Sequence, residues 1–125
     1  MAISELLEAA LTYKDMKAIA KKAGSAWVAG LKKIKPAPVS VTLVKSDPSM
    51  TAGWDYTIYS LAEVVLKEGS PPIRVGMSVS AKEGEEASGS VSADSLGVIA
   101  TFRGSTYEQV SKKLIADSAE HLSKV

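Results

Sequence analysis

In the middle of the chain, apolar residues alternate with small or polar ones. This stretch reads Ile73-Arg74-Val75-Gly76-Met77-Ser78-Val79-Ser80. Because successive side chains of a strand point to opposite faces of a sheet, this stretch predicts a half-buried strand with one apolar and one polar face. Pro71 and Pro72 precede it and the polar run 82–86 follows it, so turns are expected at both ends.

Further strands are predicted on both sides of this alternation. Residues 39–44 and 54–66 alternate in the same way, although 60–68 could instead form a helical turn. Residues 96–103 form the last predicted strand. The serine-rich segment 87–95 is compatible with a strand that turns its serines toward water. Short turns between successive strands favour an antiparallel meander of about four to five strands.

Helical periodicity dominates the two ends of the chain. Residues 4–11 predict a short first helix, and residues 14–34 predict an amphipathic second helix. Gly24 is the point at which this second helix could bend or split. The capping-box sequence 105–108 opens a predicted C-terminal helix. The expected fold is therefore α+β, with two N-terminal helices and one C-terminal helix packed on one face of the sheet.

Composition limits the class of protein before any motif is considered. Of the 125 residues, 46% are hydrophobic and 23% are charged, as in a single globular domain spanning 1–125. No apolar run approaches the roughly 20 residues of a membrane span. Glu5 and Glu8 interrupt the segment in which a signal peptide needs an apolar stretch. A cytoplasmic location without membrane contact is therefore expected.

Much familiar active-site chemistry is absent from the sequence. The chain has no cysteine, which excludes disulfides, thiolate metal sites and thiol nucleophiles, and its only histidine is His121, close to the C-terminus. It also lacks the glycine motifs that bind phosphates and dinucleotides. We therefore expect no enzymatic activity, no metal and no cofactor. A carboxylate-based enzyme that uses Asp55, Glu63 or Asp94 is the least favoured alternative.

Basic residues gather near the N-terminus. Residues 1–35 carry seven lysines and three acids, a net charge of +4, whereas the remainder carries a net charge of −3. At about 100° per residue, five lysines fall within about 60° of one another, opposite an apolar stripe through Met16, Trp27 and Ile34. They are Lys14, Lys17, Lys21, Lys32 and Lys35. Such a row suits contact with nucleic-acid phosphates, and the alternative is a solvated outer face.

Aromatic residues mark the second predicted strand. By alternation Trp54 and Tyr56 share one face and Tyr59 takes the other, and the sequence leaves open which face is exposed. An exposed aromatic beside Arg74 or Arg103 suits base stacking. The predicted nucleic-acid site therefore combines helical lysines with aromatic and basic residues of the sheet. They are Lys17, Lys21, Lys32, Lys35, Trp54, Tyr56, Tyr59, Arg74 and Arg103.

Serines recur in two neighbouring predicted strands. Ser78 and Ser80 are expected to pair across a hairpin with Ser88, Ser90 and Ser92, which would make a polar, uncharged sheet face. An exposed face is the simpler interpretation. The other interpretation is the floor of a groove that forms hydrogen bonds with a ligand.

Several features of the chain carry a resemblance to a known family. They are the two predicted N-terminal helices with a lysine-rich second one, a small antiparallel sheet bearing Trp54-Asp55-Tyr56, and a C-terminal helix. In element order, length and composition the chain resembles the ThermoDBP family of single-stranded DNA-binding proteins from hyperthermophilic archaea. The absence of cysteine and asparagine, with Gln109 as the only glutamine, also indicates a thermophilic source.

The resemblance implies sequence-tolerant binding of single-stranded DNA or RNA in a basic cleft lined with aromatics. No membrane partner is expected, and a homodimer is possible. The alternative function is a protein–protein interaction or assembly module without affinity for nucleic acid.

Overall fold

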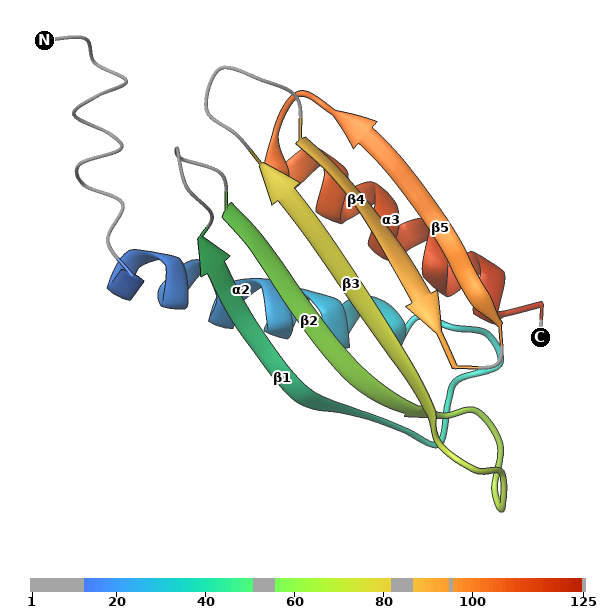
Figure 1. Ribbon diagram of the computed structural model, residues 1–125. Coiled ribbons are helices and arrows are strands. Elements are labelled where there is room, and N and C mark those ends of the chain that lie inside the picture. Colours follow the sequence, from blue (N-terminus) through green and yellow to red (C-terminus); the bar gives the residue numbers. More distant parts are fainter. Residues whose placement is uncertain (1–12, 51–55, 82–86, 95, 125) are drawn as a thin grey trace, which may run out of the picture.

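The computed structural model describes residues 13–50, 56–81, 87–94 and 96–124 of the chain. Its elements follow in the order α2 (Tyr13–Leu31), β1 (Ser40–Met50), β2 (Tyr56–Val65), β3 (Ile73–Ala81), β4 (Ala87–Ala93), β5 (Gly97–Gly104) and α3 (Tyr107–Leu122). The strands form one antiparallel sheet in chain order, and both helices lie across the same face of it (Figure 1). The predicted α+β class with an antiparallel sheet is confirmed.

The prediction of two N-terminal helices is wrong. In the described part of the chain one helix, α2, precedes the sheet and one helix, α3, follows it. The predicted first helix, residues 4–11, lies outside the described residues. A pattern of about eight residues is too short to form a helix on local propensity alone, so the sequence signal could not support this helix count.

The strand boundaries follow the alternation closely. β2 continues to Val65, so the alternative of a helical turn over 60–68 is wrong. The ambiguous segment 87–95 contains β4. In the part of the chain that the structure describes, neither helix is long and apolar enough to cross a bilayer.

The C-terminal helix begins one residue later than the predicted capping box implies. Thr106 is the N-cap, and its Oγ1 accepts a hydrogen bond from the Gln109 backbone N–H at 3.2 Å. In return Gln109 Oε1 accepts from the Ser105 backbone N–H at 2.9 Å. Gln109, and not Glu108, is therefore the residue whose side chain bonds back to the chain before the helix. Glutamine and glutamate both suit this role.

The helix α2 runs through Gly24 without interruption. The position is a close approach between α2 and β1, because a Cβ atom built on Gly24 would lie 2.8 Å from the Cβ of Ser46. Ser46 Oγ in turn donates a hydrogen bond to the Ala20 carbonyl at 2.5 Å and lies 2.9 Å from Ser60 Oγ. Glycine at this position therefore permits a close contact between α2 and β1, and it does not bend the helix.

The hydrophobic core lies between the two helices and one face of the sheet. Its largest fully buried side chains are Met16, Trp27, Leu31, Ile34, Ile58, Val64, Val75, Met77, Val79, Val91, Leu114 and Leu122. Trp27 occupies the α2 side of this core with no exposed surface. Its Nε1 donates a hydrogen bond to the Val75 carbonyl at 3.2 Å. This bond joins α2 to the central strand β3.

Candidate functional site

The face of the sheet opposite the helices, here called the open face, carries rows of hydroxyl groups. Within the β3–β4 hairpin Ser78 pairs with Ser90, and Ser80 pairs with Ser88. Ser92 lies opposite Gly76 in the next row. The expected pairing of serines across this hairpin is confirmed. Because serine is small, these rows form a low, polar surface.

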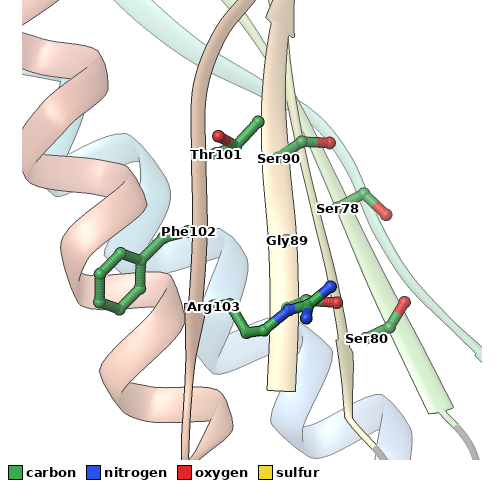
Figure 2. Close-up of a pocket in the computed structure, with 8 residues that line it drawn as sticks. Ser78, Ser80, Gly89, Ser90, Thr101, Phe102 and Arg103 are labelled. Atoms are coloured by element: carbon green, nitrogen blue, oxygen red, sulfur yellow. The ribbon is translucent and has the colours of Figure 1, made fainter. Parts of the chain in front are cut away.

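Neighbouring strands extend these rows. On β5, Thr101 pairs with Ser90, and Arg103 pairs with Ser88. On β2, Thr57 Oγ1 lies 2.7 Å from Ser80 Oγ, a hydrogen-bond distance. Figure 2 shows the serines, Thr101 and Arg103 directed to one side of the strands, whereas Phe102 points to the other.

Two hollows follow the small side chains of the open face. The first, of about 640 Å³, is lined by Thr101, Arg103 and serines of β3 and β4. The second, of about 390 Å³, extends to Tyr59. Ser78 and Ser90 line both hollows, so the two adjoin one another across β2 to β5, and together they are called the trough below.

Tyr59 is the aromatic side chain of the described residues that lies on the open face. It is 38% exposed. A Cβ atom built on Gly76 would lie 3.0 and 3.1 Å from ring atoms Cε2 and Cζ of Tyr59, so the ring rests against bare backbone. Lys45 Nζ lies 5.6 Å from the ring centroid, within cation–π distance. Contacts on two sides therefore hold the Tyr59 ring at one end of the trough.

Charged groups surround the trough and balance one another. Arg74 Nε donates to Glu63 Oε1 at 3.2 Å at one end, and Arg103 lies toward the other. Among the described residues, register and trough lining place three basic and three acidic side chains on the open face. They are Lys45, Arg74, Arg103, Asp47, Glu63 and Asp94. A ligand of this face must therefore be held mainly by stacking and hydrogen bonds rather than by net charge.

Tyr56 lies on the helix-covered face instead. Its ring centroid is 6.1 Å from that of Tyr107, with an angle of 39° between the rings. Burial raises the pKa of Tyr56, and the carboxylate of Glu108 raises it further. Trp54 lies outside the described residues. The question that alternation left open is thus answered for the described residues, because Tyr59 takes the exposed face.

Tyr107 has a buried hydroxyl that finds no hydrogen-bond partner among the described residues. Burial raises the pKa of Tyr107 far above its ordinary value near 10, and the neighbouring Tyr56 and Glu108 add to the shift. Because the folded state disfavours the phenolate, this contribution to stability is complete below about pH 10. It is lost as the pH rises from there toward the raised pKa.

Tyr107→Phe is expected to raise the free energy of unfolding by about 1 kcal/mol at pH 7, because an unpaired buried hydroxyl is removed. It should also lessen the loss of stability above pH 10. Urea unfolding at pH 7, 10 and 11 measures both effects. Tyr59→Phe, at an exposed position, is the control and should alter neither. Destabilisation by Tyr107→Phe at pH 7 would contradict the prediction.

The predicted lysines lie on the other side of the sheet. Lys17, Lys21, Lys32 and Lys35 are exposed on or directly after α2, which crosses the helix-covered face (Figure 1). The structure therefore brings Tyr59 together with the two arginines along one trough and separates the four lysines from them. The helical period indicates which side of α2 faces the core, but not which face of the sheet α2 covers.

Two residues of the open face were missed by sequence reasoning. Thr101 received no role because its place beside Ser90 depends on the β4–β5 register. Lys45 was likewise not anticipated, although alternation along β1 gives a weak signal for it. Its approach to Tyr59 follows from the pairing of β1 with β2, which shifts at a bulge between Leu43 and Lys45.

Two of the three carboxylates proposed for a catalytic site, Glu63 and Asp94, belong to residues that lie on either side of Arg74, in β2 and directly after β4. Glu63 is paired with Arg74, and the Asp94 backbone N–H donates to the Arg74 carbonyl at 3.0 Å. Asp55 lies outside the described residues. In the described ranges, no three histidine, aspartate or glutamate side chains are grouped so that they could hold a metal ion.

The chain was compared with protein-family models, with curated proteins and with solved structures. None of the three comparisons found a match. The trough on the open face and the lysines of α2 are thus the two features from which a function is inferred.

Proposed function

We propose that the open face binds single-stranded nucleic acid without base specificity and without catalysing a reaction. The observation that carries this proposal is the partly exposed Tyr59 ring at one end of a trough lined with hydroxyl groups. Stacking of a base on an aromatic ring contributes roughly 1–3 kcal/mol, and every base has a face that can stack. Bases in a duplex are already stacked, so single strands are the preferred form.

The hydroxyl groups suit the remainder of a nucleotide. Ser78, Ser90 and Thr101 each offer a donor and acceptor lone pairs, which match the polar edges of unpaired bases and the 2′-hydroxyl of RNA. Arg103, at the far side of the trough, has a planar guanidinium that can bind a phosphate through two hydrogen bonds. Arg74, which lies at the Tyr59 end of the trough and is paired with Glu63, is the second arginine that the proposal assigns to phosphate binding.

The points of resemblance to the ThermoDBP family that do not depend on two N-terminal helices, namely a lysine-rich helix before a small antiparallel sheet and a C-terminal helix, point to the same class of ligand. A thermophilic archaeal source and a cytoplasmic location belong to this proposal as well. They rest on composition and on the resemblance rather than on the trough.

Ser90→Glu tests the proposal because Ser90 lies at the centre of the trough and lines both hollows. A carboxylate there would repel phosphate and fill the polar floor. At about 200 mM salt, where binding through surface lysines is weak, we expect at least about tenfold weaker binding of labelled homopolymeric single-stranded DNA and RNA, measured by fluorescence anisotropy; tenfold corresponds to about 1.4 kcal/mol.

Ala116→Glu is the matched control, since it adds the same charge at an exposed position of α3. It should leave binding almost unchanged. If Ser90→Glu and Ala116→Glu weakened binding equally, the effect would be due to the change in net charge and not to the position of Ser90 in the trough. Absence of single-strand binding by the unaltered protein at low salt would end the proposal.

A protein–protein interaction surface is the second candidate, favoured by the edge strand β1. Three large apolar side chains are exposed at or next to it: Val39 at 51%, Leu43 at 37% and Val44 at 44%. Exposed edge strands with apolar side chains are common sites of strand pairing. A concentration-dependent dimer in light scattering, together with no oligonucleotide binding, would favour this candidate.

A further inference from the structure

From Lys17 to Lys35, the exposed charged side chains of α2 and of the turn after it are all lysines. The sequence has no acidic residue from 16 to 46. Lys17 and Lys21 lie one turn apart on the helix, and Lys32 and Lys35 follow its last turn; all four are exposed. Among the described residues, Lys21, Lys32 and Lys35 have no acidic partner within ion-pair distance. These four lysines are called the α2 lysine surface below.

The other helix is built differently. On α3, Lys113 Nζ lies 3.0 Å from Asp117 Oδ1, and just after the helix Lys124 Nζ lies 3.5 Å from Glu120 Oε1. Mixed signs of this kind are typical of a surface that serves solubility. Within the α2 lysine surface, Lys21, Lys32 and Lys35 depart from that pattern, although both helices lie on the same face of the sheet (Figure 1).

We infer that the α2 lysine surface is a second nucleic-acid-binding surface, which contacts the phosphate backbone of duplexes and single strands alike. Lysine is a flexible point charge that pairs with phosphate and releases counterions, and such contacts carry no sequence information. Between Lys17 and Lys35 the exposed residues also include Ala18, Ser25 and Ala29, and none of the exposed residues in this range is aromatic. The surface therefore has the means to hold phosphates but not to stack or read bases.

The dimensions of the surface suit a polymer. Lys17 and Lys32 are fifteen residues apart, so at 1.5 Å per residue they lie about 22 Å apart along the helix direction. That length corresponds to about six base pairs of duplex at 3.4 Å each. Four lysines placed over this length could each neutralise a separate phosphate.

A membrane surface fits these residues less well. Helices that lie in the membrane interface bury large apolar side chains among the lipids. The largest described apolar residues of α2, Met16, Trp27 and Leu31, are all at 0% exposure, and Ile19 and Val28 are half-buried. Attraction to anionic lipid would therefore depend on charge alone, whereas the backbone of duplex DNA has a higher charge density.

This inference does not rest on the proposed function of the open face. The two surfaces lie on opposite sides of the sheet, so one chain has the means to hold a single strand on one side and a duplex on the other. Duplex DNA is the probe that separates them, because paired bases cannot stack on Tyr59.

The test measures binding of a labelled 20-base-pair duplex by fluorescence anisotropy between 50 and 200 mM salt. Four phosphate contacts give a slope of log affinity against log salt of about −3 to −4, or roughly a 100-fold loss across this range. Lys17→Glu/Lys21→Glu and Lys32→Glu/Lys35→Glu should each weaken binding at 50 mM salt by at least about tenfold. The milder Lys17→Gln/Lys21→Gln removes two phosphate contacts and should make the slope of log affinity against log salt shallower by about two.

Lys112→Glu/Lys113→Glu on α3 is the control, since it changes the net charge by the same amount. Retained duplex binding by this control and by Ser90→Glu, with loss in the α2 variants, would support the inference even if the open face binds nothing. Equal loss in the α2 variants and the α3 control would overturn it. No duplex binding at 50 mM salt would also overturn it, as would binding only to phosphatidylserine vesicles. Circular dichroism of each variant confirms that α2 is intact.

Discussion

Trp27→Ala is expected to lower the free energy of unfolding by about 3–5 kcal/mol, the largest effect among the substitutions considered. The indole is fully buried between α2 and the sheet, and the substitution would leave a cavity that the surrounding side chains cannot fill. It would also remove the hydrogen bond from Nε1 to the Val75 carbonyl. A loss of this size is a large part of the total stability of a small domain.

Urea unfolding followed by far-ultraviolet circular dichroism measures this loss. Trp27→Phe keeps part of the volume and should cost less than Trp27→Ala. Val98→Ala is the control, because Val98 is 63% exposed and a change there should stay within about 0.5 kcal/mol. A cost below about 1 kcal/mol for Trp27→Ala would contradict the packing of α2 against the sheet.

Tyr59→Ala is expected to weaken binding of single-stranded DNA and RNA by about 5- to 150-fold, the equivalent of 1–3 kcal/mol for one stacked base. The ring is the stacking surface that the proposal assigns to the open face. Duplex binding should not change, since the lysines of α2 lie on the other side of the sheet. Fluorescence anisotropy with both kinds of oligonucleotide measures the difference, with the single strands at about 200 mM salt so that the α2 lysine surface contributes little to their binding.

Two variants separate stacking from other roles of Tyr59. Tyr59→Phe keeps the ring and should retain most of the affinity. Gly76→Ala keeps Tyr59 but adds a methyl group 2.6 Å from the position of its hydroxyl oxygen, so the ring must move. We expect Gly76→Ala to weaken single-strand binding. Unchanged affinity in Tyr59→Ala would refute base stacking on this residue.

The two nucleic-acid surfaces should differ in their response to salt. The open face has balanced charges, so its binding should depend weakly on salt, whereas the α2 lysine surface should show a steep dependence. Single-strand binding by the unaltered protein would then combine a salt-sensitive and a salt-resistant part.

Two features of the fold that depend on local periodicity, one strand and the buried side of one helix, could be predicted from the sequence alone. The alternation in 73–80 predicted β3, and the spacing of Met16, Trp27 and Ile34 predicted the side of α2 that is buried. Periods of 2 and 3.6 residues follow from backbone geometry, so they can be recognised in the sequence without knowledge of any other element. The serine pairing between β3 and β4 was predictable for a similar reason, because a hairpin joins neighbouring segments.

Local signals were less informative where they were short. The eight-residue pattern over 4–11 led to a helix count that the described chain does not match. The capping box was placed one residue early, because Ser105 and Thr106 are both good N-caps and each has an acid or amide three residues later. Only the packing of α3 decides between them.

The tertiary structure alone decided which residues meet. Alternation places Tyr56 and Tyr59 on opposite faces of a strand, but only the packing of both helices on one face buries Tyr56 and leaves Tyr59 in the trough. The same packing separates the lysines of α2 from the arginines of the open face. Contacts between elements distant in the chain depend on which faces are buried together, and the period of a single element contains no information about its partner.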